Sequence, residues 1–325
     1  MKSYLKNVER IFDYTDKSKY NYVLNQSERT EKFSSTMFEL FKKDLKQEDF
    51  AYYPNTKNFK EKICKFYNVK TENLFLSDGS DVGIKSIFET FTTYDRIITS
   101  EPSFPMYKVY SELYQCEYFG IPHEKDYTIS MEKILSNITH DTSLVILANP
   151  NSPMGEYKSF DEAYIEFSGK ESMIQYIDEY PNLLVTRTFS KGFGAAGCRV
   201  GMTFGHKDTI ELLSKFRQMY EITGVSLKYC EFLLNNHTLV DTYIQEVKEE
   251  KKELVSMLKG YDVIDSNCNW IHFNTTDDNL KTKQIFDKHK VLVKYCELPH
   301  DDRKNWCRLT IQPNITRQEF IKELL

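Results

Sequence analysis

The sequence of 325 residues lacks a C-x-x-C pair, an internal repeat and any apolar run of roughly 18 residues, the length of a membrane span. Its seven cysteines are odd in number and widely spaced, which argues against a disulfide framework and favours reduced thiols in a cytoplasm. We expect neither a signal peptide nor a membrane-spanning segment. The seven histidines never fall at ligand spacing, so no metal site is predicted.

An excess of basic charge is also missing. The 43 basic residues are scattered among 48 acidic ones, and the net charge of −5 leaves no electrostatic footprint for nucleic acid. What the chain does contain is a globular balance of 40% hydrophobic and 28% charged residues. The chain is long for a single core, so one large domain with a smaller one is the default expectation.

Strand-like and helix-like apolar patterns alternate from residue 57 to residue 205, as in KNFKEKICKFY followed by NLFLSD. This alternation predicts an α/β fold, a three-layer sandwich whose mostly parallel central sheet is covered on both faces. Beyond residue 260 short strands between helical stretches indicate a smaller α+β domain. We expect a large domain over residues 46–235 and a small domain from residues 1–45 and 236–325, with the N-terminal arm packed against it.

The stretch RTFSKGFGAAGCRVG, residues 187–201, contains two overlapping candidate sites. From Gly192 to Gly197 it matches the dinucleotide-binding fingerprint G-x-G-x-x-G, which requires a strand before the glycines and a helix directly after them. The strand pattern NLLVTRTF is present, but CRVGMTF alternates like a second strand. The pattern therefore disfavours a dinucleotide site.

The same stretch places Lys191 at the end of a strand pattern that we expect to be buried. A lysine in a partly desolvated pocket has a lowered pKa, and its neutral amine can form a Schiff base with a carbonyl. If that carbonyl belongs to pyridoxal phosphate, the chain must also supply a phosphate cradle, an acid for the pyridine nitrogen, a donor to the ring phenolate and a face to stack the ring on.

Blocks elsewhere in the chain carry a resemblance. The blocks are YYPNTKNFKEKICKFYNV, NLFLSDGSDVGI, EPSFPMY, NPNSPMG, FDEAYIEF, PNLLVTRTFSKGFGAAGCRVG and CRLTI. In these blocks, which span residues 50–310 in family order, the chain resembles the fold-type I pyridoxal-phosphate aminotransferases, and within them the histidinol-phosphate aminotransferase group. The resemblance implies a pyridoxal 5'-phosphate cofactor and a homodimer with shared active sites.

The resemblance assigns the chemical roles. Lys191 matches the Schiff-base lysine that also moves the proton, Asp161 the partner of the pyridinium nitrogen, and Tyr164 a donor to the ring phenolate. Asn151 is the candidate second donor, although Ser152 and not Asn151 faces the cofactor if the functional amide belongs to the second position of NPNSPMG. Phe104 matches the aromatic residue stacked on the ring, with a plain core role as the alternative.

The remaining roles concern anions. The expected phosphate cradle combines the start of a helix with the lysine loop, and its members are Gly79, Ser80, Asp81, Ser190 and Arg199. Arg308 in CRLTI matches the clamp for the substrate α-carboxylate. Tyr53 resembles the residue that reaches the neighbouring subunit's cofactor phosphate, although Tyr52 beside it could be the one in register.

The resemblance implies an aminotransferase that moves an amino group between an amino-acid donor, glutamate, and a small phosphorylated keto compound such as imidazole-acetol phosphate or dihydroxyacetone phosphate. A pyridoxal-phosphate-dependent decarboxylase of phosphothreonine or phosphoserine is the alternative, because the same electron sink serves either bond cleavage. A non-enzymatic binding module on the same fold is a third interpretation, which the retained lysine and arginines disfavour.

Two segments depart from the family pattern. Only Glu156 to Phe160 separate Gly155 from Asp161, where the family places a helix and a strand. Either the strand is lost or residues of the protein are omitted; we favour omission, because five residues at ~3.3 Å each cannot cross a sheet and return. The loop LNQSERTEKF also lacks the family's proline and final glycine, so substrate choice transfers least.

Overall fold

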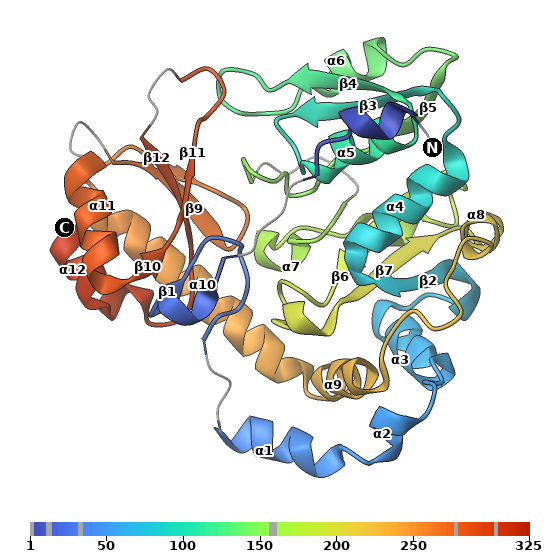
Figure 1. Ribbon diagram of the computed structural model, residues 1–325, viewed down its shortest axis with the longest axis horizontal. Helices are drawn as coiled ribbons and strands as arrows, with labels where there is room; N and C mark the ends of the chain where they lie inside the picture. Colours follow the sequence, from blue (N-terminus) through green and yellow to red (C-terminus); the bar gives the residue numbers. More distant parts are fainter. Residues whose placement is uncertain (1–2, 11–14, 32–34, 156–160, 276–278, 302–304) are drawn as a thin grey trace.

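The computed structural model describes residues 3–10, 15–31, 35–155, 161–275, 279–301 and 305–325. Figure 1 shows two bodies, a larger one that contains β2 to β7 and a smaller one that contains β8 to β12 with the C-terminus. Long helices run beneath and between them. The α/β architecture with a separate small sheet confirms the fold class expected from the sequence.

The large sheet is built from two groups of three strands. One group is antiparallel, in the order β2 (Leu74–Asp78), β7 (Val200–Gly205) and β6 (Leu184–Thr188). The other is parallel, in the order β4 (Glu117–Pro122), β3 (Arg96–Glu101) and β5 (Thr142–Val145). The predicted parallel character therefore holds except at β7, which runs antiparallel to both of its neighbours.

A single residue joins the two groups. Asp161 forms parallel bridges to Ala148 on one side and to Thr186 on the other. The Asp161 amide donates to the Leu147 carbonyl at 2.7 Å, and the Glu162 amide donates to the Thr186 carbonyl at 2.8 Å. Where the family pattern predicts a central strand, the described structure has one paired residue.

The described residues of the chain therefore lack this strand, and the omission of residues before Asp161 stays a prediction. Asp161 pairs with Ala148, just beyond the last residue of β5, and therefore lies at the carboxyl edge of this strand. Residues 156–160 themselves lie outside the described residues. A cavity of about 900 Å³ lies between β5 and β6, lined by apolar residues that include Leu144, Ile146 and Leu184.

Helices cover both faces of the antiparallel group because its strands alternate. On β2, Leu74 and Leu76 pack in the main core with α3 and α9, whereas Phe75 packs on the other face with Ile87 of α4 and Ile210 of α8. The helices are α1 (Ser35–Asp44), α2 (Glu48–Ala51), α3 (Lys57–Tyr67), α4 (Gly79–Phe91), α5 (Met106–Leu113), α6 (Met131–Ser136), α7 (Ile165–Ser168), α8 (Lys207–Ser214), α9 (Gly224–Asn235), α10 (His237–Met257), α11 (Asn279–His289) and α12 (Glu319–Leu324).

The small body carries an antiparallel sheet and holds the N-terminal arm. The sheet order is β11 (Lys294–Cys296), β12 (Trp306–Thr310), β9 (Trp270–Asn274) and β8 (Val263–Asp265). The arm adds β1 (Tyr22–Val23), which pairs in parallel with β10 (Val291–Leu292). The expectation that the whole N-terminal segment packs on this body is wrong for its first turn, Ser3–Asn7, which lies beside β3 and α5 of the large body (Figure 1). The bounds 46–235 for the large domain stay a prediction.

Within the part of the chain that the structure describes, no helix combines the length and the apolar character needed to cross a membrane.

Candidate active site

Lys191 lies in the turn that follows β6. The turn closes through the Gly194 amide, which donates to the Lys191 carbonyl at 2.9 Å, and Gly194 adopts φ +69°, where a side chain would be strained. The Lys191 ammonium donates to the Gln26 carbonyl at 2.7 Å and lies 5.3 Å from the centre of the Tyr164 ring. Burial lowers the pKa of Lys191 to about 8, and the charges of Arg308 and Arg199 add to this effect. A neutral amine is thus accessible near neutral pH.

The stretch after the glycines is the strand β7 and not a helix. Its residue Gly201 lies against the backbone of Gly79 and Ser80, where a Cβ would overlap. Gly201 therefore allows β7 to pass closely beside the start of α4, and the absence of a following helix confirms that the dinucleotide fingerprint is a coincidence of spacing.

Asp161 projects from the centre of the large sheet and is 8% exposed. Its carboxylate accepts hydrogen bonds from the Thr186 hydroxyl at 2.6 Å and from the Tyr107 hydroxyl at 2.7 Å. Burial raises the pKa of Asp161, whereas both hydroxyl donors favour its ionised form. Such a carboxylate can hold a proton on a heterocyclic nitrogen.

Tyr107 and Thr186, the two hydroxyl donors to Asp161, are candidate site residues that the sequence did not predict. Tyr107 belongs to the block EPSFPMY, three residues after Phe104, and the two rings meet edge to face at 5.5 Å. Phe104 therefore contacts the same Tyr107 side chain that donates to the Asp161 carboxylate. This places Phe104 beside the position expected for a stacked cofactor. The spacing of an aromatic residue one helical turn after Phe104 was the available signal.

Arg199 and the start of α4 form an anion-receptive corner. Arg199 is exposed and adopts φ +51°, and its guanidinium lies directly against Gly79, which begins α4 with φ +75°. Any Cβ on Gly79 would overlap that guanidinium. The free amides at the start of a 13-residue helix and a planar guanidinium together suit a phosphate.

Two further predicted cradle residues adjoin this corner. Ser190 is buried and accepts a hydrogen bond from the Thr188 hydroxyl at 2.9 Å. The Asp81 carboxylate accepts from the Tyr110 hydroxyl at 2.8 Å, so Asp81 could contribute its backbone amide to an anion and not its side chain. Within the described residues the structure thus gathers Gly79, Ser80, Asp81, Ser190 and Arg199 around one corner.

Arg308 lies in the middle of the small sheet, facing the large body. It is 7% exposed, its guanidinium carbon lies 5.3 Å from the Trp270 ring, and it donates to the Asn25 carbonyl at 2.8 Å. Its neighbours across the sheet are Lys294 on β11 and His272 on β9. Burial lowers the pKa of His272 to about 3, with the Arg308 charge adding to the effect, so His272 is neutral.

The N-terminal arm covers this site, which the sequence reasoning expected only as a loop that touches substrate. The consecutive carbonyls of Asn25 and Gln26 accept hydrogen bonds from Arg308 and Lys191. Ser27 is buried, and its amide donates to Thr310 at 3.1 Å. The arm therefore satisfies the two cations that a substrate carboxylate and a cofactor carbonyl would engage.

Three predicted residues are placed differently from the rest. Both hydrogens of the Asn151 amide are directed to serines, Ser100 at 2.9 Å and Ser103 at 3.3 Å, so its role as a phenolate donor stays a prediction. Tyr53 is 78% exposed and stacks on Tyr220 at 4.2 Å, apart from the other site residues. Tyr52 is 70% exposed as well.

Comparison with known proteins decides the family. The family model of aminotransferase class I and II matches residues 28–159 and 157–324, with the division inside the short link before Asp161. The chain belongs to the class I and II aminotransferases. The recognition of a fold-type I, pyridoxal-phosphate-dependent aminotransferase is thereby confirmed.

Two relatives of this aminotransferase are histidinol-phosphate aminotransferases. A histidinol-phosphate aminotransferase of Christiangramia forsetii is 29% identical over 291 residues, 83% of each chain. One from Carboxydothermus hydrogenoformans is 28% identical over 326 residues, covering 94% of this chain and 92% of the relative.

Solved structures share the fold. Histidinol-phosphate aminotransferase from Sinorhizobium meliloti, in complex with pyridoxal-5'-phosphate, superposes with a TM-score of 0.85 at 16% identity, covering 100% of this chain and 95% of that one. L-threonine-O-3-phosphate decarboxylase from Porphyromonas gingivalis superposes with a TM-score of 0.77 at 17% identity, covering 93% and 98%.

The site of this aminotransferase fits its cofactor, pyridoxal 5'-phosphate. The corner of Arg199 and α4 suits the phosphate, the buried carboxylate of Asp161 suits the ring nitrogen, and Lys191 with its lowered pKa suits the carbonyl. The residues that the structure gathers therefore fit this cofactor in their chemistry, and their individual roles stay predictions.

Proposed function

We propose that the chain transfers an amino group between glutamate and a small phosphorylated keto compound such as imidazole-acetol phosphate or dihydroxyacetone phosphate. The observation that carries the proposal is the position of Lys191, whose pKa responds to the charges of both Arg199 and Arg308. One arginine adjoins the start of α4 and the other lies on the small sheet. Two anion sites thus flank one reactive amine.

Each residue has a task that follows from its place. Pyridoxal phosphate supplies, when bound, a carbonyl for the lysine and a protonated ring that accepts electrons from the substrate's α-carbon. Lys191 would bind that carbonyl and move a proton at the α-carbon, Asp161 would hold the proton on the ring nitrogen, and Arg308 would orient the substrate carboxylate. Tyr164, whose ring lies beside the Lys191 ammonium, would donate to the ring phenolate.

A second cation beside Arg308 supports a phosphorylated substrate. Lys294 lies directly across from Arg308 in the β11–β12 pair, and burial lowers its pKa, with the Arg308 charge adding to the effect. One guanidinium suffices for a carboxylate, so an additional ammonium favours a substrate with a second anionic group. The names of the relatives support the same class of substrate.

Half-reactions test the proposal. Glutamate added alone to the holoenzyme is expected to convert the visible absorbance of the bound cofactor to that of its amine form, and a phosphorylated ketone is expected to reverse the change. Lys191→Ala should abolish both. Release of CO2 from phosphothreonine or phosphoserine, without the glutamate half-reaction, would instead establish the decarboxylase alternative. The structural similarity to the Porphyromonas gingivalis decarboxylase is the observation that favours this alternative.

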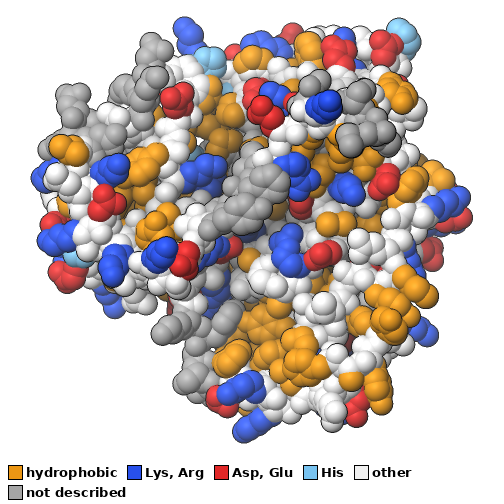
Figure 2. Space-filling model, viewed as in Figure 1, with side chains coloured by type: hydrophobic (Ala, Val, Ile, Leu, Met, Phe, Trp, Pro, Cys, Tyr) orange, Lys and Arg blue, Asp and Glu red, His pale blue; other side chains and the backbone are white. Residues whose placement is uncertain are grey.

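We further propose a homodimer with shared active sites in a reducing cytoplasm. Large hydrophobic side chains are exposed on adjoining segments around α1, α2 and the stretch after α8, among them Phe38, Leu40, Phe50, Tyr53, Phe216 and Met219. Figure 2 shows hydrophobic side chains over the lower part of the molecule, the part where Figure 1 places α1 and α2. Seven free cysteines support the reducing compartment.

A further inference from the structure

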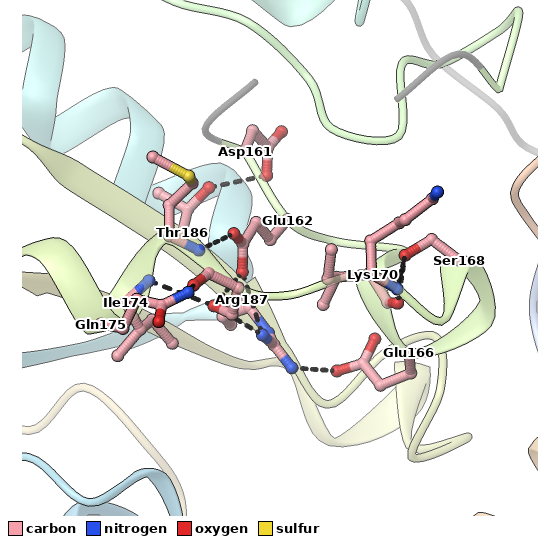
Figure 3. A network of polar contacts seen from close by, with 12 residues as sticks. Asp161, Glu162, Glu166, Ser168, Lys170, Ile174, Gln175, Thr186 and Arg187 are labelled. Carbon is pink, nitrogen blue, oxygen red and sulfur yellow. Dashed lines mark hydrogen bonds and ion pairs between the residues drawn. The ribbon is translucent and has the colours of Figure 1, made fainter. Parts of the chain in front are cut away.

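A buried ion-pair network adjoins Asp161 (Figure 3). Glu162, the next residue, is 0% exposed, and its carboxylate accepts hydrogen bonds from the Arg187 guanidinium at 3.0 Å and from the Met173 amide at 2.7 Å. The second terminal nitrogen of Arg187 donates to the Glu166 carboxylate at 2.8 Å. One guanidinium therefore bridges two carboxylates inside the large body.

The network also reaches the turn that carries Lys191. The side chain of Glu166 packs against Gly192, where an added Cβ would lie 2.8 Å from the Glu166 Cγ atom. Arg187 itself follows Thr186 on β6, and Thr186 donates to the Asp161 carboxylate. Arg187 is thus linked through Glu162 to Asp161 and through Glu166 to the residue after Lys191.

The shortened central strand gives this network a task. A regular strand holds its residues through a ladder along its whole length, whereas Asp161 has one bridge on each side. Glu162 is the first residue after that bridge, and a buried carboxylate is stable only where partners fix it. Burial raises the pKa of Glu162 while the Arg187 guanidinium opposes the shift, so the ion pair fixes the chain beside the bridge.

We propose that Arg187 is a positioning residue for the amino-transfer reaction. By bridging Glu162 and Glu166 it sets the distance between the Asp161 carboxylate and the Lys191 amine, in place of the missing strand. The proposal rests on the roles of Asp161 and Lys191 given above, and its test separates the two.

Two variants weaken the ion pairs of Arg187 with Glu162 and Glu166 without deleting a side chain. Arg187→Lys keeps the charge but loses the planar fork, and Glu166→Gln removes one charge at nearly constant volume. In each holoenzyme the pH titration of the visible absorbance of the cofactor on Lys191 is measured, together with kcat and KM for glutamate. We expect the absorbance pKa to rise, because a ring nitrogen without its carboxylate partner withdraws fewer electrons from the lysine linkage.

We expect kcat to fall in these variants while the KM for glutamate stays the same. A displacement of about 1 Å between reacting groups lowers kcat on the order of 10²-fold. The KM for glutamate should stay unchanged, because Arg308 lies on β12 of the other body, where its guanidinium donates to the Asn25 carbonyl and lies beside the Trp270 ring. A merely structural role would lower the melting temperature without moving the absorbance pKa.

Two further variants make the outcomes distinct. Arg96→Met breaks the ion pair with Glu117 at the far end of β3 and reports a simple loss of stability. Asp161→Asn gives the full spectral shift for a lost ring partner. If Asp161→Asn leaves the absorbance pKa unchanged, the role of Asp161 is wrong and the proposal falls with it. The other outcome is that Asp161→Asn shifts the absorbance pKa, whereas Arg187→Lys and Glu166→Gln keep the absorbance pKa of the wild type and of Arg96→Met. That outcome overturns the Arg187 proposal alone.

Discussion

Lys191 and Arg308 repel one another in a partly desolvated site, and backbone carbonyls of the arm are the acceptors that the structure gives them. An uncharged carbonyl offsets less of the desolvation cost than an anion does. The arrangement therefore favours an anionic ligand, and it holds the lysine ready for deprotonation. This consequence follows from burial and from like charges, both local to the residues concerned.

The lowered pKa of Lys191 gives a pH dependence with a definite sign. The amine has a pKa of about 8 in the folded apoenzyme against 10.5 for an ordinary lysine, so its neutral fraction reaches one half near pH 8 and levels off only about one to two pH units higher. We expect the rate constant for cofactor binding to follow that curve, measured by stopped-flow absorbance between pH 6.5 and 9.5. A flat profile, equal to that of Lys191→Ala, would contradict the assignment.

The same shift enters stability. Because the folded pKa is the lower one, the unfolded chain binds more protons between about pH 8 and pH 10.5, and the contribution of Lys191 to the free energy of unfolding increases with pH across that window. The free energy of unfolding of the apoenzyme can be measured by denaturant titration at pH 8 and at pH 10. From pH 8 to pH 10 the wild type should gain stability relative to Lys191→Ala, which lacks the contribution of the lysine.

Residues with a local signature could be predicted from the sequence, and residues that act across the fold could not. Lys191, Ser190 and Arg199 share one turn, and Gly79 to Asp81 open one helix, so spacing alone groups them. The donors to Asp161 come from 54 residues away in Tyr107 and 25 residues away in Thr186. No periodicity links such positions; only the packing of β3, β6 and α5 brings them together.

Tyr107 should influence the reaction through Asp161. Tyr107→Phe removes one of two hydroxyl donors to a buried carboxylate, which costs about 1–3 kcal/mol and raises the pKa of Asp161 further. We expect kcat to fall roughly 10-fold or more with the protein still folded, since 1.4 kcal/mol corresponds to that factor. The measurement is the kcat of Tyr107→Phe in steady-state kinetics. The control variant is Tyr118→Phe, which removes the tyrosine hydroxyl that donates to the carboxylate of the exposed residue Glu101. Equal effects of the two variants would argue against a role for Tyr107.

At the scale of elements, regular periodicity was the reliable guide. The helix expected over residues 57–67 is α3 to the residue, because its apolar side chains recur on one face and Asn68 ends it in the left-handed conformation. The strand expected after the glycines is β7, but its antiparallel direction was not expected, because alternation of side chains is the same in either direction. The single-residue strand at Asp161 has no periodicity to detect.

The space between β5 and β6 has the properties of a vacated strand position. Both walls are strand edges that run parallel to each other, and Asp161 closes one end by pairing with both. Leu147 and Asn149 direct backbone groups to Asp161, so the two-residue period directs those of Val145 to the same side. Apolar side chains from Leu144, Ile146 and Leu184 line the space.

Restoring the element should therefore stabilise the protein. An insertion between Gly155 and Asp161 of a helix followed by a six-residue strand rich in valine and isoleucine should fill the cavity and complete the ladder. We expect the melting temperature to rise by roughly 5 °C or more, at about 2–4 °C per kcal/mol. A Gly/Ser insertion of equal length is the control, and a strand insertion that melts no higher would argue that the space is not a strand position.

At the scale of the whole molecule, one chain does not account for every predicted site residue. The residues for the cofactor and for the substrate carboxylate gather where the two bodies meet, whereas Tyr53 lies on the surface among exposed apolar side chains. A single sequence predicts such a residue only through its resemblance to a family, because contacts between subunits leave no spacing pattern within one chain. The proposed homodimer requires this surface to lie against the site of the partner subunit.

Subunit complementation tests whether Tyr53 acts across subunits. Lys191→Ala removes the reactive amine, and Tyr53→Ala removes the tyrosine, so each variant alone should have little activity. Mixed dimers contain one site with an intact Lys191 from one chain and an intact Tyr53 from the other. If Tyr53 serves the partner, unfolding and refolding the two variants together at equal amounts should restore about a quarter of the wild-type activity, since half of randomly paired dimers are mixed and each has one complete site. If Tyr53 serves its own chain, the mixed dimers contain no complete site and the mixture should stay as inactive as the separate variants, and light scattering of the same samples shows whether dimers have formed.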